Sequence, residues 1–155
     1  RAVPEDTMQR KIIPDVVPRR NIRALKKKDT VLDCVKMMAE INVAAMIVVD
    51  DDGRLIGIVT ERDLVQRLLA KERDPATTPV GTIMTPNPDT LSPDDAAMDA
   101  LELMRARNYR HLPVIEDGRC VAMVSIRDLY AAAKAALEED IRETEAFVFG
   151  DRYGA

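Results

Sequence analysis

Two stretches of the chain repeat one pattern, Gly57-Ile58-Val59-Thr60-Glu61-Arg62-Asp63-Leu64 and Ala122-Met123-Val124-Ser125-Ile126-Arg127-Asp128-Leu129. The copies lie 65 positions apart, and each follows an Asp-Gly-Arg turn. In each copy, an apolar run typical of a strand ends in a hydroxyl residue, and a carboxylate follows three positions later, where we expect a helix to begin. Because self-similarity at a fixed period marks a repeated supersecondary unit, the chain is predicted to fold as two units packed on one another.

The similarity covers most of residues 10–140 and predicts the order strand, helix, strand, strand, helix in each repeat. In the first repeat we expect a strand within 21–26, a helix beginning at 31, a hairpin of 45–50 and 54–60, and a helix over 61–72. In the second repeat we expect a strand within 89–92, a helix beginning at 97, a hairpin of 112–116 and 119–125, and a helix over 126–145. The predicted class is therefore α/β (mixed α+β), with two helices packed on a small mixed sheet in each repeat.

The predicted domains are a first repeat over 10–73, a linker over 74–79, a second repeat over 80–145 and a C-terminal tail over 146–155. The linker contains two prolines and small polar residues, which break both periodic patterns. The segment from Glu138 onward is acidic and then carries apolar side chains at Phe147, Val148, Phe149 and Tyr153. This segment is either a subunit or partner contact or a cover for the edge of the core.

Composition describes a soluble globular protein of 155 residues, 46% of them hydrophobic and 32% charged. The longest apolar run, 43–49, is far shorter than a membrane span, and no signal peptide is visible, so we expect a cytoplasmic protein. A net charge of −4 gives no bulk attraction to nucleic acid. The local basic run between Arg19 and Lys28 is more typical of a solvated face than of a phosphate contact.

Side chains suited to metal or redox chemistry are few. Cys34 and Cys120 stand at apolar positions, which favours buried thiols over a disulfide or redox pair. One histidine and no clustered cysteines offer no zinc site. Asp50-Asp51-Asp52 could hold magnesium, but a polar hairpin turn explains it better. The methionines are interpreted as core residues, although some could face a second subunit. Four of them lie on the first helix of each repeat: Met37, Met38, Met98 and Met104.

The hydroxyl and the carboxylate of the repeated motif suit a ligand that carries ribose and phosphate. The first amides of a helix are expected to be unpaired and to attract an anion, with Thr60 and Arg62 (matched by Arg127) adding donors. Asp63 can accept hydrogen bonds from a ribose diol, as carboxylates do in dinucleotide sites. The alternative is a capping box, in which both side chains satisfy the helix itself. The duplication, and an aspartate where glutamate or glutamine caps better, favour the ligand role.

These residues resemble the cystathionine-β-synthase (CBS) domain, which occurs in tandem pairs called Bateman modules. The resemblance covers nearly the whole chain and rests on the duplicated motif at 57–63 and 122–128, on the Val80–Pro86 stretch and on the Arg110–Val114 strand. It implies a pseudo-two-fold pair of repeats, dimerisation into a flat disc, and two clefts for adenosine ligands. The expected ligands are AMP, ADP or ATP, with S-adenosylmethionine or NAD(H) less favoured.

By the family pattern, the first cleft combines Ile58, Thr60, Arg62 and Asp63 with Thr82, Tyr109, Arg110 and His111. The second combines Met123, Ser125, Arg127 and Asp128 with Asp15, Val43 and Ala44. The first is expected to hold a phosphorylated nucleotide better, because it has the cation Arg110 where the second has Ala44. Ala122 replaces the family's glycine and puts a close ligand approach to the second cleft in doubt. His111 is as consistent with a packed strand start as with a ligand contact.

The predicted function is a non-catalytic adenine-nucleotide sensor that dimerises and acts on an unknown protein partner in trans. The alternative is a structural or interaction scaffold whose clefts hold no physiological ligand. An enzyme is disfavoured because the sequence offers no activated nucleophile with a positioned base, so no catalytic residue is predicted.

Overall fold

The computed structural model describes residues 10–153, with side chains described through residue 148. The described chain forms two compact units. Of the described residues, unit 1 contains 10–19, 92–112 and 124–153, and unit 2 contains 20–91 and 113–123. The units are not the two sequence repeats, because each unit includes a segment of the other repeat. The fold is the mixed α+β class that the sequence predicts.

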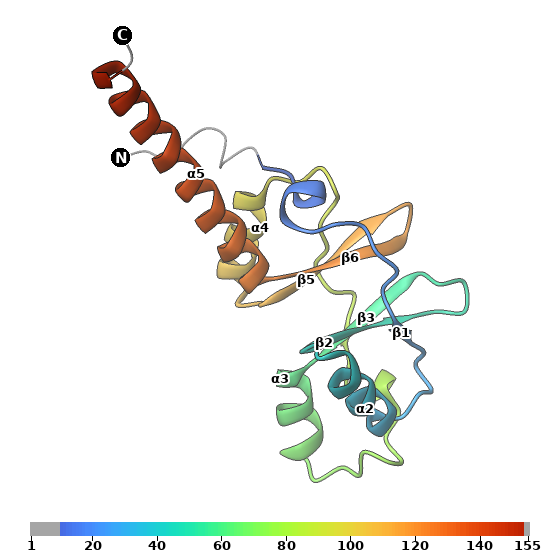
Figure 1. The fold of residues 1–155 in the computed structure, drawn as a ribbon. Coiled ribbons are helices and arrows are strands. Elements are labelled where there is room, and N and C mark those ends of the chain that lie inside the picture. Colours follow the sequence, from blue (N-terminus) through green and yellow to red (C-terminus); the bar gives the residue numbers. More distant parts are fainter. Residues whose placement is uncertain (1–9, 154–155) are drawn as a thin grey trace. The chain divides into compact units, whose positions relative to one another are not determined.

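Unit 2 is built on a four-stranded sheet of order β1-β2-β3-β4 (Figure 1). Its strands are β1 (Ala24–Leu25), β2 (Ala45–Val49), β3 (Leu55–Thr60) and β4 (Thr85–Pro86). β1 is parallel to β2, whereas β2 pairs antiparallel with β3, and β3 with β4. The β2–β3 register places Thr60 opposite Ala45, so the hydroxyl of the first motif stands at the very end of its strand.

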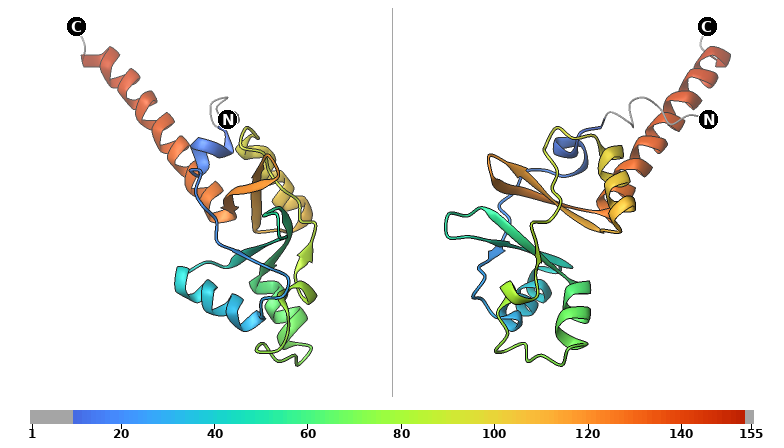
Figure 2. Two further views of the ribbon diagram at one scale, coloured as in Figure 1. Left: turned by 90° about the vertical axis from the view of Figure 1, so that its right-hand side faces the viewer. Right: turned by 180° about the vertical axis from the view of Figure 1, so that it is seen from behind.

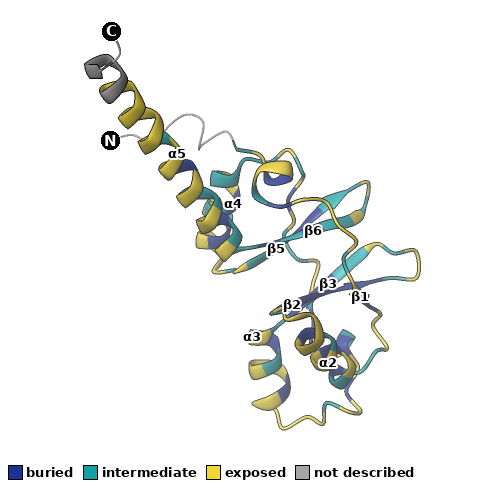
Figure 3. Cartoon of the chain, viewed as in Figure 1, coloured by how far each residue is buried: buried dark blue, intermediate teal, exposed yellow. Residues whose placement is uncertain are grey.

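The helices of unit 2 cover the core of this sheet. They are α2 (Val31–Ile41), the short α3 (Glu61–Asp63), its π-helical continuation η2 (Leu64–Leu69) and the 3₁₀ turn η3 (Val80–Thr82). Buried residues are dark blue in Figure 3. In unit 2 they form one hydrophobic cluster: Leu25, Val31, Cys34, Met38, Met46, Val48, Val59, Leu68, Val80, Ile83 and Met84. Each fully buried aliphatic side chain contributes about 1.5–3 kcal/mol to folding.

Unit 1 contains α4 (Ala97–Arg107), α5 (Ile126–Tyr153) and the irregular turn η1 (Ile12–Val16), which contacts α5. Figure 2 shows α4 and the first turns of α5 side by side. Both α2 and α4 end on an asparagine with a left-handed backbone, Asn42 and Asn108, so the helix stop is duplicated as well. The remaining strands, β5 (His111–Glu116) and β6 (Arg119–Ser125), form a two-stranded sheet.

Both predicted hairpin turns form in unit 2 and pack on each other. Gly53 and Gly118 have positive φ angles of 82° and 79°. The Arg119 guanidinium lies where a Cβ on Gly53 would stand, and the Arg54 guanidinium lies likewise at Gly118. Both glycines are therefore required by the backbone and by the arginine that crosses them.

The Asp50-Asp51-Asp52 run forms the polar turn that the sequence favours. The carboxylate of Asp50 accepts hydrogen bonds from the backbone amides of Arg54 and Asp52, both at 2.9 Å. The Arg54 amide is the main cause that holds the pKa of Asp50 below its usual value. The charged carboxylate is thus used to close the turn.

The predicted elements differ from the structure mainly at their ends. The first repeat's second helix ends at Leu69 rather than at 72, and α5 continues past the expected end at 145 to Tyr153. Residues 89–92 form no strand, and Leu91 makes only an isolated parallel bridge to Val114. β4 was not predicted because a two-residue strand with a proline gives no alternating pattern.

The methionine prediction holds for Met38 and Met104, which are buried, while Met37 and Met98 are half-buried. In the segment after Glu138, Phe147 and Val148 are exposed on α5. The side chains of Phe149 and Tyr153, predicted with them, lie outside the described residues.

The cysteines are a buried and a half-buried thiol, both unbridged. Burial raises the pKa of Cys34 from 9.0 to about 11, and burial likewise raises the pKa of Cys120. Because the folded Cys34 thiol keeps its proton where an unfolded one loses it, its contribution to stability falls as pH rises above 9.0.

We expect Cys34 to react with Ellman's reagent at pH 8 only when the chain unfolds, since it is inaccessible and its thiolate is about a thousandth of the total at three pH units below its pKa. A Cys120→Ser variant isolates this thiol, and the release of thionitrobenzoate with and without urea measures it. Equal rates in both conditions would contradict the burial of Cys34.

Candidate functional site

The first copy of the motif lies in unit 2, where β3 passes into α3. The Thr60 hydroxyl accepts a hydrogen bond from the Asp63 amide at 3.4 Å, and Asp63 Oδ2 accepts one from the Thr60 amide at 2.9 Å. The Thr60 hydroxyl also donates to Asp63 Oδ2 at 3.2 Å. This reciprocal pairing is a capping box.

The second copy lies in unit 1, where β6 passes into α5, and it repeats the same geometry. Asp128 Oδ2 accepts a hydrogen bond from the Ser125 amide at 2.8 Å, and the Ser125 hydroxyl accepts one from the Asp128 amide at 3.2 Å. The capping alternative is therefore the observed arrangement in both copies. It engages Oδ2 of each carboxylate, so more acceptor capacity for a ligand is left on Oδ1.

The expectation of unpaired helix amides at the motif is wrong for two amides in each copy. The Glu61 amide donates to the Ala44 carbonyl at 3.2 Å, and the Ile126 amide donates to the Arg110 carbonyl at 2.9 Å. The amides of Asp63 and Asp128 are satisfied by the capping hydroxyls. An anion bound here depends more on cationic side chains than on these backbone groups.

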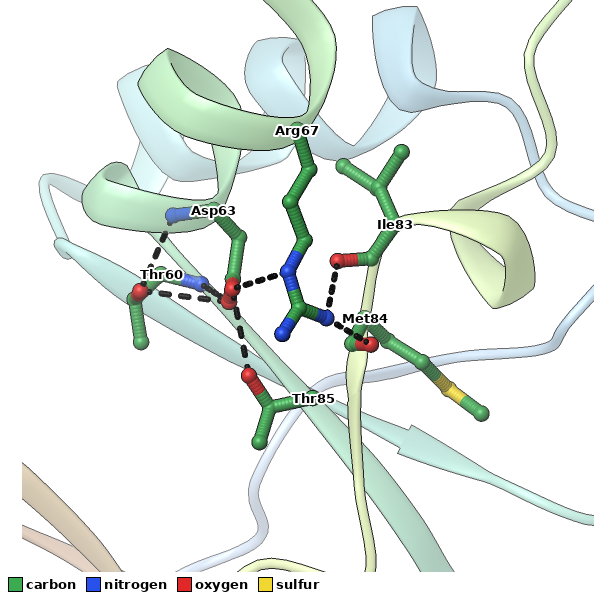
Figure 4. A network of polar contacts seen from close by, with 6 residues as sticks. All are labelled: Thr60, Asp63, Arg67, Ile83, Met84 and Thr85. Carbon is green, nitrogen blue, oxygen red and sulfur yellow. Dashed lines mark hydrogen bonds and ion pairs between the residues drawn. The ribbon is translucent and has the colours of Figure 1, made fainter.

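Asp63 is the centre of a larger network of polar contacts (Figure 4). The residue is only 6% exposed, and its Oδ1 accepts a hydrogen bond from the Thr85 hydroxyl at 3.1 Å. Arg67 Nε lies 3.7 Å from the same oxygen. A buried carboxylate is tolerated here because hydrogen bonds and a cation compensate for its lost hydration.

Arg67 also connects this carboxylate to the chain that leads into β4. Its Nη1 donates to the carbonyl oxygens of Met84 at 2.8 Å and of Ile83 at 3.3 Å (Figure 4). The sequence did not predict a role for Arg67 or Thr85. The i,i+4 spacing of Asp63 and Arg67 is the signal that could have found the ion pair.

The other candidates of unit 2 contribute different surfaces. Ile58 is buried in β3, Arg62 and Val43 are exposed, and Ala44 and Met123 are half-buried. The Thr82 hydroxyl donates to the Pro79 carbonyl at 2.7 Å and accepts a long hydrogen bond of 3.5 Å from Arg73 Nη1. Thr82 is therefore a structural turn residue with its hydroxyl at the surface.

The other candidates of unit 1 lie on three elements. Asp15 is exposed in η1, and its carboxylate accepts a hydrogen bond from the Lys11 amide at 2.8 Å. Tyr109 is half-buried after α4, Arg110 and Arg127 are exposed, and His111 is half-buried at the first position of β5. The grouping of candidates into two clefts draws on both units and stays a prediction.

The described part of the chain has neither a metal-binding cluster nor a membrane-spanning helix. No three histidine, cysteine or acidic side chains there are placed to share a metal ion. None of the helices in residues 10–153 combines the length and the apolar character that crossing a bilayer requires.

The sequence model of the CBS domain matches the chain twice, over residues 13–70 and 80–135. The chain belongs to the CBS domain family. The CBS domain-containing protein CBSX3, mitochondrial, of Arabidopsis thaliana is 36% identical to it over 126 residues. That match covers 79% of this chain and 61% of CBSX3, so the chain spans about three fifths of this relative's length.

Solved structures of CBS-domain proteins share the fold. A protein with CBS domains from Burkholderia ambifaria is 36% identical with a TM-score of 0.71, covering 75% of this chain and 85% of that one. The structure of CBSX2 in complex with AMP is 29% identical with a TM-score of 0.64, covering 76% of this chain and 91% of that one. CBS-domain proteins are regulatory modules, and CBSX2 binds AMP.

We expect Asp63→Ala to lower the free energy of unfolding by about 3 kcal/mol and Asp128→Ala by about 1 kcal/mol in the absence of ligand. The first change strands the Thr85 hydroxyl and Arg67 beside a buried cavity, whereas the second removes only a cap. Urea denaturation measures both, with the exposed Asp51→Ala as a control expected within about 0.5 kcal/mol of the wild type. Equal losses for Asp63 and Asp128 would contradict the structural difference between the two copies.

Proposed function

We propose that the chain is a non-catalytic regulatory module that binds an adenine nucleotide and transmits its occupancy to a protein partner in trans. The observation that carries this proposal is the duplicated carboxylate, whose Oδ2 accepts the same backbone hydrogen bond at the strand–helix junction of each repeat. Family membership supports it, because CBS-only proteins are generally regulatory and CBSX2 binds AMP. AMP is the first candidate, then ADP and ATP, with S-adenosylmethionine and NAD(H) less favoured.

The motif has the chemistry that a nucleoside phosphate needs. A carboxylate oxygen can accept hydrogen bonds from ribose hydroxyls, and each such charge-assisted bond contributes about 1.5–3 kcal/mol. The exposed guanidinium groups of Arg62, Arg110 and Arg127 are suited to phosphate oxygens. Ile58 and Met123, which precede the two hydroxyls by two positions, offer apolar contacts to the base. The other proposed ligand-binding residues are those of the two clefts that the family pattern predicts.

The motif hydroxyls are not arranged for catalysis. Those of Thr60 and Ser125 accept hydrogen bonds from helix amides, and the neighbouring carboxylates are occupied by backbone donors. A nucleophile needs a base free to take its proton, and the Asp63 carboxylate, to which the Thr60 hydroxyl donates, is also engaged by the Thr60 amide, Thr85 and Arg67. These observations support a binding role for the motif rather than a reactive one.

The alternative is a scaffold without a physiological ligand, and the engaged carboxylate of Asp63 favours it for one copy of the motif. An adenine nucleotide would raise the free energy of unfolding of a sensor but not of a scaffold. The scaffold is therefore a second candidate that a binding experiment can distinguish. The expected cytoplasmic location also stays a prediction, since one relative is named as mitochondrial.

Calorimetric titration with AMP, ADP and ATP is expected to show binding of at least one of them. At a ligand concentration about 100 times the dissociation constant, the nucleotide should raise the free energy of unfolding by about 2.7 kcal/mol. The Asp63→Ala, Asp128→Ala double variant should lose the binding heat, while adenosine-free pyrophosphate serves as a ligand control. No heat and no stabilisation by any of the three nucleotides at millimolar concentration would favour the scaffold.

We further propose that the chain forms a homodimer through the helices of unit 2. Val65 and Leu69 are exposed on η2, and Val35 and Ile41 are exposed on α2. Large apolar side chains exposed on the helices of one unit are consistent with a protein contact surface.

Light scattering should give a dimeric mass for the wild type and a monomeric mass for Leu69→Glu, because a buried, unpaired charge opposes association. Gln66→Glu is the matched control, since it adds the same charge at an exposed polar position of η2. A dimeric Leu69→Glu variant would place the contact elsewhere, and a monomeric wild type would refute the dimer.

A further inference from the structure

We propose that the two motif carboxylates have different roles. Asp128 accepts the ribose hydroxyls of the first nucleotide that binds. Asp63 is held by contacts with Thr85 and Arg67, here called the latch, which a ligand has to break. This inference rests on the proposed nucleotide binding and assigns its order to the two copies. It reverses the ranking that the sequence predicts from Arg110 in the first cleft. It is carried by the hydrogen bonds around each carboxylate.

The acceptor capacity of Asp63 is nearly exhausted. A carboxylate has about four lone-pair positions for hydrogen bonds. Thr60 uses two of them on Oδ2, from its amide at 2.9 Å and its hydroxyl at 3.2 Å. Thr85 uses a third on Oδ1 at 3.1 Å, and Arg67 Nε stands 3.7 Å from that same oxygen. A ribose diol donates two hydrogen bonds, so Asp63 cannot receive both without releasing one of these partners.

The acceptor capacity of Asp128 is largely open. In the part of the chain that the structure describes, the hydrogen bond to its carboxylate comes from the Ser125 amide, at 2.8 Å on Oδ2. Asp128 is also half-buried, whereas Asp63 is buried. Oδ1 of Asp128 is therefore the oxygen that two ribose hydroxyls can approach at the smallest cost.

The two copies differ in the residue that stands four positions after the aspartate. The residue 65 positions after Arg67 is Ala132, so the second repeat has no cation on the equivalent helical turn. Ala132 stands four residues after Asp128, as Arg67 stands four residues after Asp63. The ion pair is thus absent from the second copy because of residue type, independent of side-chain rotamers.

The latch also links the first carboxylate to the backbone next to β4. Arg67 holds the carbonyl oxygens of Ile83 and Met84, and Thr85 in β4 holds Oδ1 (Figure 4). A ligand that takes Oδ1 of Asp63 displaces the Thr85 hydroxyl and so loosens this connection. Arg67 and Thr85 are accordingly positioning residues, and they make the Asp63 site weaker and coupled to β4.

The test is calorimetric titration of the full chain with AMP, resolved into a tighter and a weaker step. Asp128→Asn should weaken the tighter step at least tenfold, while Asp63→Asn should leave it within twofold. Thr85→Val should strengthen the weaker step severalfold, because it frees Oδ1 without touching the carboxylate. Thr90→Val, at an exposed threonine of the same unit, is the matched control and should change neither step.

The opposite pattern, in which Asp63→Asn removes the tighter step and Asp128→Asn does not, would overturn the assignment. A weaker step that Thr85→Val leaves unchanged or lowers would overturn the latch. Thr85→Val keeps Asp63 itself, so its effect on the weaker step tests the latch even where Asp63→Asn fails to fold. Absence of heat with the wild type would instead reject the proposed nucleotide binding. The latch has a separate test in a double-mutant cycle of Asp63→Asn and Thr85→Val, measured as free energies of unfolding. Additive effects of the two substitutions would reject the latch.

Discussion

The structure depends on a reciprocal pair of hydrogen bonds between a hydroxyl residue and an aspartate three positions later. This pair fixes where β3 stops and α3 begins at Thr60, and where β6 stops and α5 begins at Ser125. It satisfies donors that a strand-to-helix junction otherwise leaves open. The same atoms that end the strand are those that could hold a ribose, so the structural and the binding role compete for the carboxylate oxygens.

Local patterns predicted most of the fold, because hairpins and amphipathic helices leave periodic signals in the sequence. The Asp-Gly-Arg turns and the buried Met38 and Met104 follow from such signals. The end of α5 was misplaced because the chain has neither a proline nor a glycine between 126 and 149 to stop a helix. The exchange of residues 113–123 into unit 2 depends on contacts between distant segments, which no local window contains.

The sequence predicts where the motif residues stand but not the hydrogen bonds that they make. Spacing alone identifies Thr60 and Asp63, yet a capping box and a ribose site use the same residue types at the same spacing. The amide partners, the carbonyls of Ala44 and Arg110, lie 16 or 17 positions away in sequence and carry no side-chain signal. The hydrogen bonds of Arg67 to the Ile83 and Met84 carbonyls could not be predicted either, because backbone acceptors carry no side-chain signal. The ion pair of Arg67 with Asp63, in contrast, follows from the i,i+4 spacing.

In the proposed sensor, duplication followed by divergence would let one motif stabilise the fold and also respond to a ligand. A ligand shifts a conformational equilibrium only through a difference in affinity between two states. In that proposal, a carboxylate with open acceptor positions, such as that of Asp128, accepts the ligand without rearrangement and provides affinity. A carboxylate engaged by Thr85 and Arg67 can take a ligand only by breaking contacts that reach β4, and therefore provides the difference between states. Replacing Arg67 by the alanine that the second repeat has at 132 would remove the ion pair and leave Thr85 as the partner of Oδ1, which would reduce that difference.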